Sequence, residues 1–143
     1  MAANQVHGYN TKFTCNDTAG TERDISADGN DVTITSDMPL ADVTGFGSVS
    51  KSFVAGQYGW KVDYKGFYNT ASNIGADTVL GPLSISTACG SVNVAFGGSA
   101  SGQAYYKGSA FCTAYGRTAG VGGGVNVTAS FTGNGPLTRG TIA

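Results

Sequence analysis

Side chains of the kinds that perform catalysis are scarce in this sequence. His7 is its single histidine and lies in what we expect to be a terminal arm, far from any partner for acid–base chemistry. Cys15, Cys89 and Cys112 stand far apart, without the spacing of about two to four residues typical of structural zinc sites. Their odd number suits reduced, buried thiols better than a disulfide framework. We therefore expect no enzyme, no metal site and no cofactor.

Two segments share only part of a ligand-binding pattern. Residues 28–31, Asp-Gly-Asn-Asp, contain oxygen ligands and a glycine, but they lack the later ligands and the final Glu of a calcium loop, so we interpret them as a turn. The glycine-rich run 120–124 lacks the Lys and the Ser or Thr of a phosphate-binding loop and leads into a predicted strand. We interpret it as a connection.

Aromatic side chains offer a third kind of chemistry, which is stacking on sugars or bases. Tyr105 and Tyr106 are adjacent, and Trp60 and Tyr64 share one predicted strand face. Aromatic residues on strands belong more often to a core or an interface, and we favour that interpretation. The eight basic and nine acidic residues give a net charge of −1 and are scattered singly. Without a basic stripe, sequence-specific DNA binding is disfavoured.

The composition is that of a turn-rich β protein. Gly makes up 23 of 143 residues, only 12% are charged, and the apolar 41% recur at period two, which argues against disorder. Residues 1–143 suffice for a single domain. No apolar run approaches the roughly 20 residues that span a bilayer, and the N-terminus lacks the features of a signal peptide. We expect no membrane insertion of the subunit and assembly in a cytoplasm.

Period-two alternation predicts most of the strands. Residues 125–132 show it most strictly, and in residues 60–68 Trp60, Val62, Tyr64 and Tyr68 share one face. Shorter strands are expected over 9–15, 22–25, 31–35 and 91–96. In the strand over 103–115, the small residues Gly108, Ala110, Cys112 and Ala114 are expected on one face.

One short helix is expected over residues 69–83, with Thr70 or Ser72 as its cap, Ile74, Leu80 and Leu83 buried, and Gly81-Pro82 as its end. Residues 1–8 and 133–143 show no periodicity and are expected to be terminal arms. The predicted fold is mainly β: an antiparallel β-sandwich or partly open barrel of about seven or eight strands with one short flanking α-helix. Its unprotected edges suit pairing with neighbouring subunits.

Residues 37–59 form a long, glycine-punctuated loop that carries apolar side chains of its own. Phe46, Val49, Phe53 and Val54 have no obvious partner within the chain, and a weak alternation over 49–54 favours an extended hairpin. Long loops with exposed apolar side chains commonly find their partner in another chain. We therefore predict an assembly role for this loop.

Several short motifs follow one another in a fixed order along the chain, and their order and spacing support a resemblance to a known family. Residues 42–48 (Asp-Val-Thr-Gly-Phe-Gly-Ser), 53–56 (Phe-Val-Ala-Gly) and 62–68 (Val-Asp-Tyr-Lys-Gly-Phe-Tyr) are followed by 71–80, 106–111 and 133–141. This series resembles the major tail tube proteins of long flexible-tailed, lambda-like siphovirus bacteriophages, and the resemblance covers residues 42 to 141. It implies six copies in a ring, with the inner sheets joined into one barrel and with rings stacked through the long loop.

The resemblance also implies site residues and partners. The inter-ring contacts would come from Asp42, Val43, Phe46, Val49, Phe53 and Val54. Arm contacts would come from His7, Leu137 and Arg139. The lumen face, along which double-stranded DNA passes non-specifically, would include Asp31, Thr33, Lys61, Asp63, Lys65, Lys107, Asn126 and Thr128. Those residues carry three positive and two negative charges, an unfavourable balance for a DNA channel.

The predicted function is thus a self-assembling structural subunit of a tail tube that delivers DNA into the host cell. Further partners would be the tape-measure, tail-tip and terminator proteins, and the location would be the virion tail. The alternative is a binding module, either a phage head-decoration protein or a carbohydrate-binding β-sandwich that uses Trp60 and the paired tyrosines. An enzyme is a distant third hypothesis.

Overall fold

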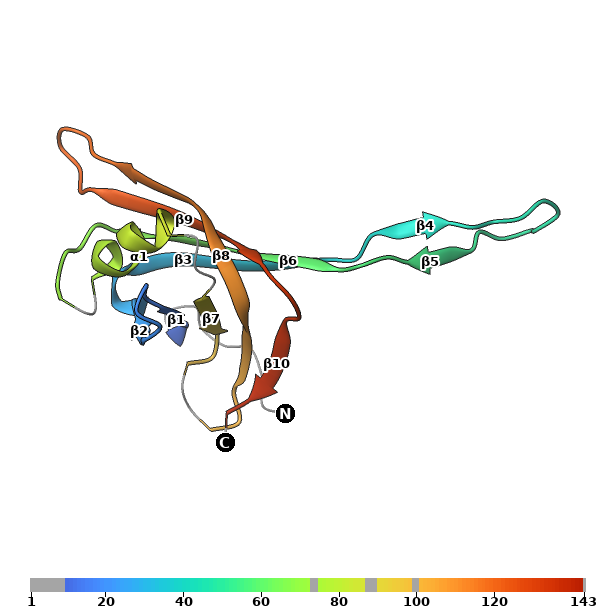
Figure 1. Ribbon diagram of the computed structural model, residues 1–143, viewed down its shortest axis with the longest axis horizontal. Coiled ribbons are helices and arrows are strands. Elements are labelled where there is room, and N and C mark those ends of the chain that lie inside the picture. The colour runs from blue at the N-terminus through green and yellow to red at the C-terminus, as the bar shows by residue number, and fades with distance from the viewer. Residues whose placement is uncertain (1–9, 73–74, 87–89, 99–100, 143) are drawn as a thin grey trace, which may run out of the picture.

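One continuous antiparallel sheet forms most of the molecule (Figure 1). The computed structural model describes residues 10–72, 75–86, 90–98 and 101–142. The strand order is β2-β1-β7-β8-β9-β6-β3, and β10 pairs with β8 beside this path. The bounds are β1 Lys12–Asn16, β2 Glu22–Asp24, β3 Gly29–Asp37, β6 Gly59–Phe67, β7 Gly90–Ala95, β8 Ala104–Thr118, β9 Asn126–Gly133 and β10 Thr138–Thr141.

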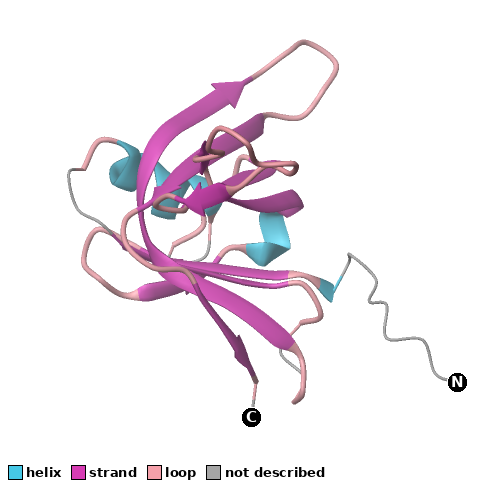
Figure 2. Ribbon diagram, turned by 90° about the vertical axis from the view of Figure 1, so that its right-hand side faces the viewer, coloured by secondary structure: helices cyan, strands magenta, loops and turns pink. Residues whose placement is uncertain are grey.

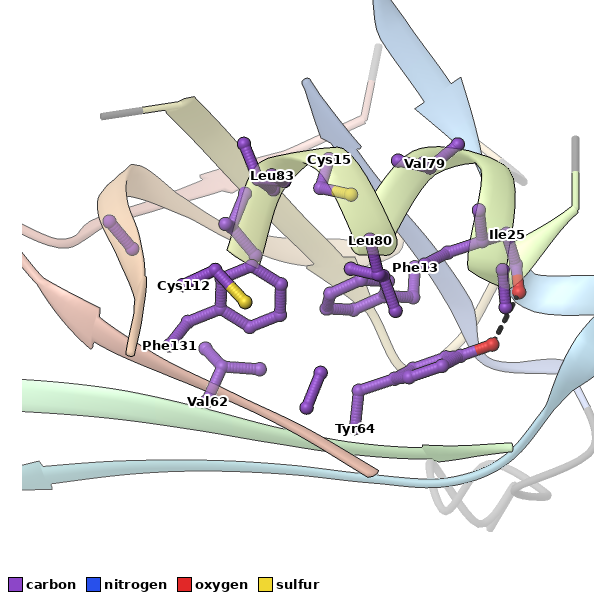
Figure 3. Close-up of a cluster of buried hydrophobic side chains, with 14 of the residues drawn as sticks. Phe13, Cys15, Ile25, Val62, Tyr64, Val79, Leu80, Leu83, Cys112 and Phe131 are labelled. Carbon is purple, nitrogen blue, oxygen red and sulfur yellow. Dashed lines mark hydrogen bonds between the residues drawn. The ribbon is translucent and has the colours of Figure 1, made fainter. Parts of the chain in front are cut away.

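The sheet curls so that its two halves share one core. The ring of Phe13 in β1 stacks on Tyr64 in β6 with centroids 5.0 Å apart, and it lies 5.9 Å from the ring of Phe131 in β9. The hydroxyl of Tyr64 donates to the carbonyl of Ile25, 2.9 Å away, which joins β6 to the segment after β2 (Figure 3). The predicted partly open antiparallel barrel is therefore confirmed.

Helix α1 (Ala76–Ser84) covers one opening of this core (Figure 2). Its buried residues are Ala76, Val79, Leu80 and Leu83, the spacing of a single helical stripe, and they pack toward β8 and β9. Alternate residues of the strands supply the rest of the core, including Val62, Val94, Val127 and Ala129.

The predicted start and end of the helix were wrong. The helix begins at Ala76, because Gly75 is extended and the side chain of Asp28 accepts the Ala76 N–H at 3.0 Å. Neither Thr70 nor Ser72 is the cap, and Ile74 lies outside the described residues. Pro82 does not end the helix, since its missing N–H affects only the last turn, and the helix continues to Ser84.

Strand β8 contains an irregularity that the alternation did not predict. Its pairing with β9 shifts register between Cys112 and Ala114, so Ala114 lies opposite Ser130 and Tyr115 lies opposite the buried Ala129. Ala114 was expected to share the face of Cys112, but it is exposed, and Tyr115 packs against the core instead.

The C-terminal segment belongs to the body of its own chain. Residues Thr138–Thr141 form β10, which pairs with β8 from Lys107 to Ala104. Upstream, the carbonyl of Gly135 accepts the indole N–H of Trp60 at 3.0 Å. The interpretation of 133–143 as an arm without secondary structure was wrong for its described residues, while the predicted arm 1–8 lies outside the described part of the chain.

Smaller differences concern element ends. Residues Ser26–Asp28 form one turn of 3₁₀ helix, and β3 follows directly at Gly29, where a tight turn was expected. The first strand begins at Lys12 and not at residue 9, which is undescribed. Tyr68 was expected on the buried face with Trp60, but it follows the end of β6 and is exposed.

Candidate assembly surfaces

A hairpin projects from the body at the end where β3 finishes and β6 begins (Figure 1). Strands β4 (Leu40–Asp42) and β5 (Phe53–Ala55) pair with each other in a sheet of their own. Beyond them the Val43 N–H donates to the Ser52 carbonyl at 2.9 Å, and the Ser52 N–H donates to the Thr44 hydroxyl at 2.8 Å. The loop predicted over 37–59 is therefore an ordered arm.

Asp42 fixes the start of the hairpin tip. Its Oδ1 accepts the hydroxyl of Thr44 at 2.6 Å and the N–H of Thr44 at 2.9 Å. These two hydrogen bonds hold the pKa of the Asp42 carboxyl below its usual value, and the bond from the Thr44 hydroxyl has the larger effect. Asp42 was predicted as a stacking residue, and the geometry gives it a role within its own hairpin as well.

Many of the large apolar side chains exposed on the described surface belong to the hairpin. Phe46 and Val49 at the tip are fully exposed, and about half of the Val43, Phe53 and Val54 side chains is exposed. Leu40, Met38 and Tyr58 extend this apolar surface toward the body. All the predicted inter-ring residues thus lie on one projecting element, and exposed apolar side chains gathered on one element are typical of a protein-interaction site.

The sheet of β3, β6, β9 and β8 has a polar face directed away from the core. Cross-strand neighbours form rows on it: Asp31 lies opposite Lys65, which lies opposite Thr128, and Thr33 lies opposite Asp63, which lies opposite Ser130. The hydroxyl of Ser130 donates to Asp63 Oδ1 at 2.9 Å. Adjacent positions on β6, Val62 and Tyr64, are buried on the other side.

Most of the predicted lumen residues meet on this polar face. Asp31, Thr33, Lys61, Asp63, Lys65, Asn126 and Thr128 share it through the registers of β3, β6 and β9. Lys107 also points away from the core, but it lies on the part of β8 that pairs with β7 and β10, opposite Asn93 and Thr138, and not beside β9. Asp37 lies on the same face, two positions beyond Thr35 on β3. Lys61 and Lys65 are therefore accompanied by three aspartates on this part of the sheet, so the excess of positive charge expected from the sequence is absent there.

Two exposed aromatic residues on the polar face were not predicted as part of it. Phe67 lies opposite Asn126, and Phe111 lies opposite Thr132. Both side chains are substantially exposed. Period-two spacing could have indicated both, since Phe67 follows Lys65 by two positions on β6 and Phe111 follows Lys107 by four on β8.

The predicted arm contacts are not brought together. The Leu137 N–H donates to the hydroxyl of Tyr58 at 3.2 Å, and the Leu137 side chain packs against the core of its own chain. Arg139 lies on β10 opposite Tyr106. His7 lies outside the described residues.

The proposed stacking platforms are mostly part of the core. Trp60 and Tyr64 are buried, and both donate to backbone carbonyls of the same chain, which leaves neither free for a sugar. Burial raises the pKa of the Tyr64 hydroxyl above its ordinary value. The binding-module hypothesis that uses Trp60 is therefore not supported by the geometry.

Cys15 and Cys112 are buried free thiols, as expected, and Cys89 lies outside the described residues. Burial raises the pKa of Cys15 to about 12, so its thiol is protonated at neutral pH. Within the described ranges, no three His, Cys, Asp or Glu side chains lie together as metal ligands. The same residues include no helix long and apolar enough to cross a membrane.

The two edges of the sheet differ in length. β3 ends the strand order on one side with nine residues, and β2 ends it on the other with three. Only β6 pairs with β3 among the described strands, so a row of backbone N–H and C=O groups on β3 is available to another chain.

Comparison with known proteins identifies this architecture. No protein-family model and no curated protein matches the sequence. The solved structure of the SPP1 tail tube matches with a TM-score of 0.76 at 11% identity, over 96% of this chain and 80% of that one. This is the tail tube fold. The same tail tube fold occurs in the C6-symmetric tail of an empty gene transfer agent particle, with a TM-score of 0.78 at 15% identity, over 94% and 98% of the two chains.

The likeness extends to a baseplate structure. The baseplate of the anti-feeding prophage contains a chain that matches with a TM-score of 0.69 at 14% identity, over 99% of both chains. The shared fold therefore extends over nearly the whole length of this chain.

Proposed function

We propose that this chain is a structural, non-catalytic subunit of a phage tail tube. Copies would assemble into hexameric rings, and the rings would stack into a tube that conducts DNA into the host cell. The observation that carries this proposal is the apolar hairpin projecting from a tail tube fold. In an isolated subunit, the fully exposed Phe46 and Val49 leave apolar surface in water. In a filament, a contact with another copy would bury that surface.

Two kinds of contact would build the tube. Within a ring, the free edge of β3 would pair with a neighbouring copy and extend the polar sheet around a channel. Between rings, the β4–β5 hairpin would bury its apolar side chains on the next copy. Permanent interfaces of this kind bury on the order of 2,000 Å² or more. The six-fold symmetry of the similar gene transfer agent tail supports a ring of six.

The polar face would line the channel. Its two lysines are offset by three aspartates, Asp31, Asp37 and Asp63, among hydroxyl side chains such as Thr33, Thr128 and Ser130. This balance would let the phosphates of double-stranded DNA pass without being retained. In this role the chain would be made in the host cytoplasm and would reside in the virion tail, in contact with tape-measure, tail-tip and terminator proteins.

Electron microscopy of the purified chain tests the proposal. We expect tubes or stacked six-fold rings in negative stain. Deleting residues 43–58 should leave rings or monomers without long tubes. A milder variant, Phe46→Ser with Val49→Ser, should shorten the tubes, whereas the matched control Ser48→Ala with Ser50→Ala on the same tip should not.

Two results would contradict the proposal. A chain that stays monomeric at high concentration and binds a glycan or a capsid would favour the binding-module or head-decoration alternative. Tubes of normal length from the deletion variant would show that the hairpin does not stack the rings.

A further inference from the structure

A pocket of about 400 Å³ opens on the surface of β1, β2, β7 and β8, away from the core. Thr14 of β1 and Asn93 of β7 are directly opposite each other at its base. Thr14 is about nine-tenths buried, and neither its Oγ1 nor Asn93 Oδ1 has a hydrogen-bond partner in the described structure. Buried polar atoms without partners are costly, so this pocket is built for an occupant that supplies hydrogen bonds.

The charges around the pocket specify the kind of occupant. Glu22 and Asp24 of β2 line one side, and Lys12 of β1 forms an ion pair with Asp24 at 3.5 Å. Glu22 has no ion-pair partner among the described residues. The lining therefore carries a net charge of −1 and an excess of acceptor atoms. Tyr105 contributes an aromatic wall. An ammonium group on an aliphatic stem, with three donors, fits this combination.

The hairpin presents such a group. Lys51 is the only charged residue between Asp42 and Lys61. It is exposed beside the apolar tip and has no acidic partner in the described structure. β1 and β2 belong to the body and not to the hairpin, and they lie below β3 in Figure 1. The projecting group and the pocket are thus on different surfaces of the chain, as a head-to-tail contact between copies requires.

We infer that this pocket receives the Lys51 side chain from the hairpin of a second copy in the next ring, an inference that rests on the proposed function. The ammonium group donates to Glu22 and to the two polar atoms at the base, while the methylenes pack on Tyr105. The contact fixes the rotational register of one ring on the next, which apolar burial alone specifies weakly.

Charge exchange tests the pairing. Lys51→Glu and Glu22→Lys each place like charges together, and we expect each to raise the critical concentration for tube formation by about tenfold or more. The double variant restores an opposite-charge pair in every contact and should return the critical concentration close to the wild-type value. Lys51→Arg is the conservative control and should retain assembly. Both residues are exposed, and a thermal melt of each variant checks that the fold is intact.

Carbodiimide cross-linking of wild-type tubes gives an independent readout. We expect mass spectrometry to find Lys51 joined to Glu22 or Asp24 between chains, and to find no such link in dissociated subunits. The inference is overturned if the double variant assembles no better than the single variants, or if single reversals leave tubes unchanged, which would mean that water alone fills the pocket. Failure of the wild-type chain to form any rings or tubes would instead overturn the proposed function.

Discussion

Asp17 shows how one residue can stabilise a turn through its charge. Its two carboxylate oxygens accept the N–H groups of Ala19 and Thr21 and the guanidinium of Arg23, at 2.9 to 3.0 Å. The hydrogen bond from the Thr21 N–H, followed by that from Arg23, lowers the pKa of Asp17 below its ordinary value. The turn between β1 and β2 therefore depends on this carboxylate being ionised.

This arrangement predicts a specific pH dependence. Because the folded-state pKa is lowered, the stabilisation by Asp17 is complete above the unfolded-state pKa of about 3.9 and is lost as the pH falls through the folded-state value. We expect Asp17→Asn to lower the urea midpoint at pH 7 and to have little effect near pH 2. Asp37→Asn serves as the control, because Asp37 is exposed and forms no ion pair with the described residues. An equal deficit at both pH values would contradict the assignment.

At the same scale, the sequence predicted the burial of Tyr64 but not what its hydroxyl does. Alternation along β6 placed the ring on the inner face, where it is fully buried. The acceptor is the carbonyl of Ile25, 39 positions away in the sequence, and no local pattern indicates that pairing. Likewise, the indole N–H of Trp60 finds its acceptor 75 positions away at Gly135. Alternation and residue type predict which side chains are buried, whereas the hydrogen-bond acceptor of each depends on the tertiary structure.

Helix α1 depends on a residue from another element. Asp28 at the end of the 3₁₀ turn accepts the Ala76 N–H at 3.0 Å and the Asn69 side-chain N–H at 2.9 Å. A carboxylate at a helix N-terminus satisfies a free donor and interacts favourably with the helix dipole. Thr70 and Ser72 were expected as caps because they lie next to the helix in the sequence, whereas Asp28 lies 48 positions from Ala76.

Removal of that carboxylate should be measurable. We expect Asp28→Ala to lower the free energy of unfolding by about 1–2 kcal/mol, because the helix loses its cap and Asn69 loses its acceptor. Asp28→Asn keeps an acceptor oxygen and should lose less. Urea denaturation followed by fluorescence of Trp60 provides the measurement. If the alanine and asparagine variants lose the same amount, the charge and not the hydrogen bond carries the effect.

Strand elements were predictable where alternation is unbroken and were mispredicted where the backbone departs from it. β6 and β9 follow their patterns closely, with Val62, Tyr64, Val127 and Phe131 buried as expected. In β8 the register shift after Cys112 exchanges the faces of Ala114 and Tyr115. An irregularity of one residue depends on pairing with β9, so it cannot be found from β8 alone.

For the whole molecule, the proposed role of the polar face as a channel wall can be tested with DNA. Neutralising Asp31 and Asp63 together would leave only Asp37 to offset Lys61 and Lys65, a change of two charges per copy on the proposed wall. We expect tubes of the Asp31→Asn, Asp63→Asn variant to retain short DNA duplexes at low salt and to release them at high salt. Wild-type tubes should retain little DNA at either salt concentration.

Co-sedimentation of duplex DNA with assembled tubes measures this effect. The control is Asp24→Asn, which changes a charge on β2, at the other edge of the sheet from β3. In the Asp63→Asn change, the side-chain amide oxygen can still accept the Ser130 hydroxyl, so the sheet itself should be undisturbed. Loss of tubes in the double variant would show that these aspartates lie in a subunit interface and not on the channel wall.

At this scale the sequence predicted a partly open β barrel and a projecting loop, because alternation and misplaced apolar residues are visible in one chain. It mispredicted the tail, since β10 has no alternation of its own and forms only because β8 offers a free side there. The pocket over Thr14 and Asn93 could not be predicted from the sequence either, because its lining residues come from strands that are far apart in the chain.

The hairpin extends from one side of the body only (Figure 1). A polymer stacked through this hairpin, as proposed, would have a direction and two chemically unlike ends. One end would display the apolar hairpins, and the other would display the surfaces that receive them. Growth at the two ends would then proceed at different rates. A protein that stops growth would need to bind only the end that is growing. A protein that starts growth would need to present the same kind of surface as that growing end.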